Sequence, residues 1–571
     1  VDNSKSYVFN GNGFLAGHTA LVKRGSGVLA ISNDNTYTGG TRISGGTVSV
    51  NMLSNSTRAY GGLGGVVESA DLFVMENGAT LQTTETVTQG SPMKMEGKDG
   101  GCVENLKDFI VETPVEGTLL TKKGDGWMKL NTVCPSLERL AINGGTVQCV
   151  ACDRPAQTVE FISGTLYENT GSSYAIHVPE GGSGTWSLAN RSTYNNKITG
   201  EGTLTIYCAV EHGNGWFATR TPVAVNLSLF TGTINATADM ADSYPRFTLN
   251  TSSGMPDGTL NITAGVTVQN TGRTFRIGKL AGKGTLGGYA SFANDGATGV
   301  NTWQVGCDDD FAWAGTVTAN SKFEKVGSGK MTVSGVWDNT GEVAVKEGTL
   351  CLNDRSAENA MLGSGELSVE DGAVLCGMGK LGNASVTVER GGRLYSGTRE
   401  GASSGTLDFS GKRLTVSTGG EVLFNVASKV RCTTLEGISS FSLRGTLKVS
   451  VREGLELEAG DEFQLWVANR TALSSACTLD LDSPGEGLEW DTSALENGIL
   501  KVKTATGITG VVSGEPVDCV VYTLDGARAG SFTCMPSEVG EYMERNGFRS
   551  GMYMVKMTQG QRTESRKVTV D

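Results

Sequence analysis

The chain of 571 residues has only three histidines, His18, His177 and His212. A Ser-His-Asp triad needs a histidine beside the nucleophile, and no Gly-x-Ser-x-Gly elbow accompanies any of the three. The glycine-rich stretch at Lys23–Gly27 lacks the Gly-x-x-x-x-Gly-Lys-Ser/Thr spacing of a phosphate-binding loop. We therefore predict no catalytic residues. Whether the chain is an enzyme stays open, with a non-catalytic role favoured.

The sequence also lacks long apolar runs and clusters of basic residues. No apolar stretch approaches the ~18 residues that cross a bilayer, so we expect no membrane-spanning segment. The formal net charge of −13 gives no electrostatic reason to bind nucleic acid. The chain starts at Val1 without a basic-then-apolar leader, so we interpret it as mature, trimmed or a fragment.

The twelve cysteines are unevenly spaced, and only Cys149 and Cys152 lie close together. A zinc site needs a second close pair, or histidines at ligand spacing, and neither follows. We predict no metal and no cofactor. Cys351 and Cys376 occupy positions where a strand presents a small apolar side chain, which indicates buried free thiols. Cys149 and Cys152 are either a local disulfide or two unlinked thiols.

Glycine, in contrast, is abundant, with 81 residues, about twice the usual share. A Lys-x-Gly-x-Gly unit that continues into an alternating apolar strand occurs three times, and each copy reaches a second glycine corner 21 residues after the first. The first corners are Gly25, Gly124 and Gly327, and the second corners are Gly46, Gly145 and Gly348. The same interval in three distant copies indicates a structural repeat.

The strands of each unit alternate apolar and polar residues, so that Leu29 and Ile31 face one side, as do Met128 and Leu130. Three short strands in about 20 residues, turning at glycines, predict one coil of a parallel β-helix, in which neighbouring coils complete the core. We predict an all-β fold with a long parallel β-helix over residues 1–503. We take it as right-handed, although periodicity does not fix handedness. Roughly 20 coils would make a rod on the order of 100 Å.

The segment Lys23–Asn51, which ends in Asn-Thr-Tyr-Thr-Gly-Gly-Thr-x-Ile-x-Gly-Gly-Thr-Val, resembles the β-strand repeat of autotransporter passenger domains. The copy at Lys325 lacks the Tyr-Thr-Gly-Gly-Thr element, and the copy at Lys122 has Cys134–Leu137 in its place. Residues 485–502 resemble the closing motif of such passengers. The resemblance implies an exported β-helical scaffold and says little about what it binds.

Residues 504–571 predict a small antiparallel β-sandwich, from Val520–Gly526, Gly551–Met557 and Arg566–Asp571. This tail resembles the C-terminal sorting domain of Bacteroidetes type IX secretion substrates. That resemblance implies the export machinery as a partner, and a secreted or outer-membrane surface-attached protein. The tail departs from the family in Cys519, Cys534 and an insertion at 536–546. The alternative is an ordinary capping domain over the last coil.

Asp308, Asp309 and Asp310 form the densest carboxylate cluster of the sequence. Catalytic β-helices that act on polysaccharides place aspartate pairs on one face. Consecutive residues on a strand alternate faces, so at most two of these carboxylates would converge. We expect a solvated corner instead.

Four aromatic residues are the candidate binding residues: Trp216, Phe217, Trp303 and Trp313. A flat aromatic face stacks on a sugar ring, so these residues suggest a glycan or surface polysaccharide as partner. The alternative is that they fill the stack inside the rod.

We predict an exported cell-surface stalk, adhesin-like or binding a glycan or other partner, that is not catalytic. The alternative is a polysaccharide-active β-helix enzyme, either a lyase or a glycoside hydrolase, or the C-terminal accessory part of one. A third hypothesis is a role in packing an outer layer or matrix. A binder should present an outward row of aromatics. An enzyme should bring carboxylates, or a carboxylate and a basic residue, together across adjacent coils.

Overall fold

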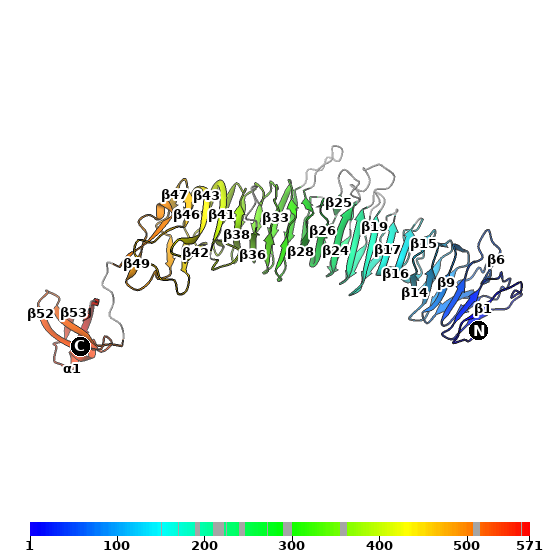
Figure 1. The fold of residues 1–571 in the computed structure, drawn as a ribbon, viewed down its shortest axis with the longest axis horizontal. Helices are drawn as coiled ribbons and strands as arrows, with labels where there is room; N and C mark the ends of the chain where they lie inside the picture. The colour runs from blue at the N-terminus through cyan, green and yellow to red at the C-terminus, as the bar shows by residue number, and fades with distance from the viewer. Residues whose placement is uncertain are drawn as a thin grey trace.

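A computed structural model shows a long rod of stacked parallel strands and a small antiparallel unit at the C-terminal end of the chain (Figure 1). The structure describes all residues except 150, 169–170, 189–193, 209–221, 224, 239–245, 250, 271, 289–299, 354–361, 403, 506–513, 561 and 571. Among the described residues, no helix is long and apolar enough to cross a membrane.

The strands pair in parallel with residues one coil further along the chain. Leu29 lies opposite Val48, 19 residues later, and Trp303 lies opposite Phe323, 20 residues later. Phe323 in turn lies opposite Val343. This regular offset is that of a β-helix, so the predicted fold class is confirmed. The handedness stays a prediction.

Four runs of paired strands carry the features described below. Ladder A contains β15 (Trp127–Leu130), β16 (Leu137–Cys149), β17 (Thr158–Glu168), β19 (Ser183–Leu188), β21 (Thr203–Cys208) and β24 (Thr233–Ala238). Ladder B contains β14 (Val115–Lys123), the first halves of β16 and β17, β18 (Ala175–Val178) and β20 (Lys197–Gly200).

Ladder C contains β34 (Lys330–Val333), β36 (Thr349–Asn353), β38 (Val374–Lys380), β40 (Arg393–Ser396), β42 (Glu421–Ser428) and β44 (Thr446–Val451). Ladder D contains β30 (Asn301–Val305), β33 (Ser321–Lys325), β35 (Val343–Val345), β37 (Leu367–Val369) and β39 (Ser385–Val388). A third side of the middle coils is formed by β22 (Pro222–Val223), β25 (Arg246–Leu249), β27 (Thr267–Asn270), β29 (Thr285–Gly287) and β32 (Thr316–Val317).

One hydrophobic core runs through the rod, from Leu21 to Val502. Its inward side chains stack from coil to coil, as in the series Leu29, Val48, Leu81 and Val103, none of which is exposed. A fully buried side chain of this size contributes about 1.5–3 kcal/mol relative to exposure. Since each coil has only two neighbours, the stack supplies a core that no single coil has.

The corner glycines allow coils to approach closely. Gly25, Gly124 and Gly327 have φ values of 72°, 79° and 75°, in the left-handed region that favours glycine. A Cβ atom at Gly124 would lie 2.4 Å from the carbonyl oxygen of Asn105 on the preceding coil. The same atom at Gly25 would lie 2.4 Å from the carbonyl oxygen of Asn3. These contacts explain why the repeat keeps glycine there.

The lysine of each repeat is buried at the same corner, which the sequence did not indicate. Lys23, Lys122 and Lys325 have no exposed surface. The ammonium of Lys122 donates to the carbonyls of Lys123 at 2.9 Å, Gly124 at 2.7 Å and Gly144 at 3.2 Å. Lys23 donates to Arg24, Gly25 and Gly45, and Lys325 donates to Val326, Gly327 and Glu347.

The third carbonyl belongs in every case to the residue before the second glycine corner, one coil away. A buried ammonium needs all three of its protons bonded, and here they are. Burial lowers the pKa of Lys122 and of Lys325 to about 8. Each lysine therefore joins two successive coils through their backbones.

The end of the rod changes to antiparallel pairing. β45 (Glu462–Gln464), β50 (Ile499–Thr504) and β49 (Leu488–Asp491) form a three-stranded antiparallel sheet in that order. Strand β49 and most of strand β50 lie within the segment 485–502, whose sequence resembles a passenger closing motif. Its pairing differs from that of the parallel coils before it.

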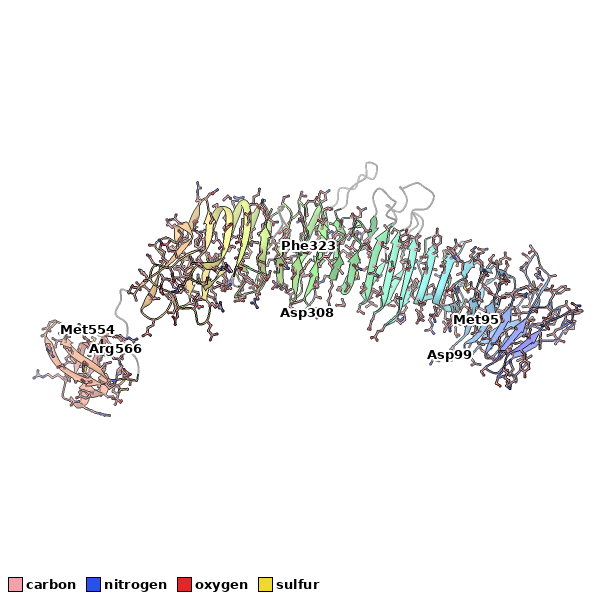
Figure 2. The ribbon with its side chains drawn as sticks, in the orientation of Figure 1. Met95, Asp99, Asp308, Phe323, Met554 and Arg566 are labelled. Carbon is pink, nitrogen blue, oxygen red and sulfur yellow. The ribbon has the colours of Figure 1, made fainter. Side chains whose placement is uncertain are left out.

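The C-terminal unit contains β51 (Val517–Thr523), β52 (Arg528–Cys534), α1 (Val539–Arg545), β53 (Gly551–Gln559) and β54 (Arg562–Val570). The strands form one antiparallel sheet in the order β52-β51-β53-β54. Helix α1 occupies the sequence insertion at 536–546 and contacts β54, so a helix stands where a sandwich has its second sheet. The unit has its own core, from Val517 to Val570. Figure 2 labels Met554 and Arg566 in it.

Candidate functional site: an outward aromatic strip

Two of the four candidate binding residues lie inside the rod. Trp303 on β30 has no exposed surface, and its ring lies edge-on to Phe275 with centroids 6.1 Å apart. Trp313 on β31 (Phe311–Trp313) is 1% exposed and lies 5.9 Å from Trp337. This burial favours the alternative that they fill the stack. Trp216 and Phe217 lie outside the described residues, and the binding role of all four stays a prediction.

The three consecutive aspartates have three different partners. Asp308 accepts a hydrogen bond from the hydroxyl of Ser328 at 2.7 Å, and this bond lowers the pKa of Asp308. Asp309 pairs with the ammonium of Lys279 at 2.6 Å. Asp310 accepts from the backbone N–H of Lys330 at 2.8 Å. The carboxylates therefore hold neighbouring coils at a corner; Figure 2 shows Asp308 at the edge of the rod.

Ladder A carries a row of aromatic side chains on its outer side. The registers run from Lys129 through Gln148, Tyr167, Ser187 and Tyr207, one residue per coil. Alternate residues of β15 point inward, since Met128 and Leu130 are buried. Trp127, on the outer side, is 41% exposed. We give the name aromatic strip to Tyr167 and Tyr207 of this register, to Gln148, and to Trp127, which stands two residues before Lys129 and opposite Thr146.

The strip has a regular spacing along the rod. Tyr167 and Tyr207 are half-buried and stand on alternate coils, so their backbones are about 10 Å apart. The ring of Trp127 reaches across the intervening coil to Tyr167, with centroids 6.3 Å apart and planes at 52°. Such amphipathic rings offer an apolar face, and the side chains between them offer hydrogen bonds.

A polar hollow lies on ladder B, across the glycine corner of β16 and β17 from the strip. Its volume is about 560 Å³. Arg139 on β16 pairs with Glu160 on β17, with 3.4 Å between Nε and Oε2. His177 lies opposite Glu160 on the next coil, and its Nδ1 lies 3.1 Å from the hydroxyl of Thr199. The hollow is also lined by Lys98, Thr118, Glu138, Gln157 and Thr158.

This hollow brings a carboxylate and basic groups together across adjacent coils. The sequence does not indicate this hollow, because its residues belong to no motif and are separated by about one coil length. In the structure, the carboxylate of Glu160 pairs with the Arg139 guanidinium, and the hollow offers this ion pair and several hydrogen-bonding side chains to a polar ligand.

The carboxylate of Glu168 is buried inside the rod, in the middle coils. Glu168 has no exposed surface; it accepts hydrogen bonds from Trp186 Nε1 at 2.6 Å and from the Ser172 hydroxyl at 3.1 Å. Burial raises its pKa to about 7. It lies in the closed core, where no ligand approaches, so we assign it to the fold.

All twelve cysteines are free thiols in this structure. Cys351 and Cys376 are buried, as predicted, and lie opposite each other on neighbouring coils. Cys149 and Cys152 are buried and unlinked, which is one of the two predicted alternatives. Within the described ranges, no three His, Cys, Asp or Glu side chains lie close enough together to hold a metal ion.

Two comparisons with known proteins agree on the passenger resemblance. The family model of the passenger-associated-transport-repeat matches residues 21–50. The chain is 25% identical over 392 residues to "Adhesin BmaC autotransporter" of Brucella suis biovar 1 (strain 1330). This match covers 65% of the chain and 10% of that protein, so the chain spans about a tenth of the relative's length. The protein is accordingly secreted or attached at the outer-membrane surface.

Proposed function

We propose that the chain is a non-catalytic, adhesin-like segment of a surface-exposed passenger, and that its aromatic strip binds a glycan. The observation that carries the proposal is that Trp127, Tyr167 and Tyr207 stand on the outer side of one ladder, on alternate coils, with Tyr167 and Tyr207 in one register and Trp127 two residues before it. The printed name of the Brucella protein, an adhesin, supports the same class of function.

The physical mechanism is the summation of weak contacts along a straight, rigid surface. A glycan chain laid along the rod would stack sugar rings on the aromatic faces and exchange hydrogen bonds with the side chain of Gln148. Tyr and Trp offer large contact areas with few rotatable bonds, so little side-chain entropy is lost on binding. Because adjacent contacts are tethered, each additional sugar binds at a high effective concentration.

The decisive experiment compares the full chain with the double variant Trp127→Ala/Tyr167→Ala on a glycan array, followed by calorimetry on retained glycans. We expect the double variant to lose at least about tenfold in affinity, since 1.4 kcal/mol corresponds to that factor. The matched control is Tyr60→Ala, an exposed aromatic away from the strip, 47% exposed. Failure to retain any glycan, or equal retention by the double variant, contradicts the proposal.

A second candidate, a polysaccharide-active enzyme, is favoured by one observation, the hollow with Arg139, Glu160 and His177. Incubation of the chain with polysaccharides, with measurement of new reducing ends and of unsaturated products, separates the candidates. Under our proposal neither product forms. Product release that Glu160→Gln abolishes would favour the enzyme, and the strip would then position its substrate.

We also propose two domains, residues 1–503 and 504–571, in which the second serves as a sorting or capping module. Separate hydrophobic cores support this division. Deletion of 504–571 should leave the rod folded, as measured by circular dichroism, and should change where the protein accumulates in its native host. Unfolding of the rod would favour the capping role over sorting.

A further inference from the structure

The outer side of ladder C holds a second hollow, far along the chain from the aromatic strip. Its volume is about 450 Å³. Asn425 and Ala427 on β42 and Ser450 on β44 form its floor, and Arg399 and Ala402 border it from the segment between β40 and β41 (Gly405–Val416). Arg452, just after β44, closes another side.

A buried amide on this floor has no partner. Asn425 is only 5% exposed, yet its side-chain Nδ2 donates no hydrogen bond within the described part of the chain. Its backbone N–H, in contrast, donates to the hydroxyl of Thr433 at 2.9 Å. Buried polar groups are bonded as a rule, so an unbonded donor beside a hollow indicates a place for an acceptor. Ser450, its register partner on the next coil, adds a hydroxyl beside it.

The two arginines supply positive charge outside the described ion pairs, and the nearby carboxylate of Asp482 accepts from the backbone N–H of Val451 at 3.0 Å. Neither Arg399 nor Arg452 forms an ion pair with a residue that the structure describes, although both are exposed. The nearby carboxylates of Glu400 and Glu421 are bonded to Arg393 instead, at 2.9 and 3.0 Å. A guanidinium offers a planar fork that binds an oxyanion through two parallel hydrogen bonds.

We propose that this hollow binds an anionic sugar through its oxyanion, which is either the carboxylate of a hexuronate or a sulfate ester. Arg399 and Arg452 would bind the oxyanion, and the amide of Asn425 would donate the hydrogen bond that it lacks. Ala402, Ala427 and Val451 contact the apolar side of the ring. The site is independent of the aromatic strip and stands even if the strip binds nothing.

The test uses calorimetry on the full chain with three probes of equal length: a hexuronate oligomer, a sulfated oligosaccharide and a neutral oligosaccharide. We expect at least one anionic probe to bind, the neutral probe to bind at least tenfold more weakly, and affinity to fall as salt rises. The anionic probe that binds more tightly identifies the oxyanion.

Arg399→Gln and Arg452→Gln should each weaken the anionic probe about tenfold, and the exposed Arg413→Gln is the matched control. Both substituted arginines are exposed, so the variants should fold as the parent does, which circular dichroism checks. Three outcomes would each overturn the proposal. They are binding of the neutral probe as tightly as the anionic probes, no binding of either anionic probe, and binding of the anionic probe by both variants as tightly as by the parent chain. Loss of binding with Trp127→Ala would instead assign the sugar to the strip.

Discussion

Two regions of the rod are built from the same kind of coil. In one region the aromatic side chains face outward, and in the other they face the core. In ladder A, Trp127 comes first in its strand and faces outward, while Met128 behind it is buried. In ladder D, Trp303 takes an inward position and lies opposite Phe323, which Figure 2 labels within the rod. The comparison shows that the position of a residue within a strand, and not its type, decides whether its side chain packs in the core or faces solvent.

The largest expected effect is the difference in stability loss when each of these two tryptophans is replaced by alanine. Trp303→Ala should lower the free energy of unfolding by about 3–5 kcal/mol, because it removes a fully buried ring and leaves a cavity. Trp127→Ala should cost less than about 1 kcal/mol in stability and lose glycan affinity instead. Urea unfolding of both variants measures the difference. Equal losses in the free energy of unfolding would contradict the contrast between an inward and an outward tryptophan.

The next effect contrasts a buried with an exposed lysine. Lys122→Met leaves three partly buried carbonyls without their donor and should cost about 3 kcal/mol, since each such group is expensive to leave unbonded. Lys129→Met breaks a partly exposed ion pair with Asp108 and should cost at most about 1 kcal/mol. Thermal unfolding compares them. A small loss for Lys122→Met would mean that the corner carbonyls are hydrated.

A third prediction concerns Glu168, whose pKa is raised by burial to about 7 from an ordinary value of 4.5. The folded state then holds the proton more tightly than the unfolded state. The resulting stability is complete below about pH 4.5 and is lost as the pH rises through 7. Glu168→Gln should remove this slope and be the more stable protein at pH 8. Unfolding curves between pH 5 and 8 test this, with the exposed Glu201→Gln as control.

The smallest effect is expected at the surface charges of the first coils. Arg42 pairs with Glu76 at 3.0 Å and with Glu96 at 2.9 Å, and all three side chains are partly exposed. Arg42→Gln should cost no more than about 1 kcal/mol. The loss should shrink further at high salt, where exposed pairs are screened. A loss that is independent of salt would point to packing of the arginine stem instead.

Much of the rod could be predicted from the sequence, because glycine spacing and apolar alternation are local signals. The corner glycines and the inward positions of Leu29, Met128 and Met331 follow from them directly. The sequence shows a lysine in each repeat but does not show that it is buried. Its three carbonyl partners are backbone atoms, which no residue type in the sequence reveals. The sequence suggests Trp303 and Trp313 as binding residues because it shows that they are aromatic. It does not show whether their side chains point into the core or outward.

The outward sites could not be predicted for a different reason. Tyr167 and Tyr207 are 40 residues apart, and their alignment on alternate coils follows only once the length of each coil is known. Arg399, Asn425 and Arg452 likewise meet only because three separate segments converge on one face. Insertions make the coils unequal in length, so the register between them is a three-dimensional property.

The stacking of each coil only on its two neighbours also determines how the rod responds to force. Tension applied along the chain from one end would peel coils away in sequence, since the strands of each coil pair with those of the adjacent coils. Each released coil of about 20 residues lengthens the chain by about 70 Å. A surface protein built in this way extends stepwise under flow before it breaks, and the three buried lysine corners would add resistance at the coils that they join.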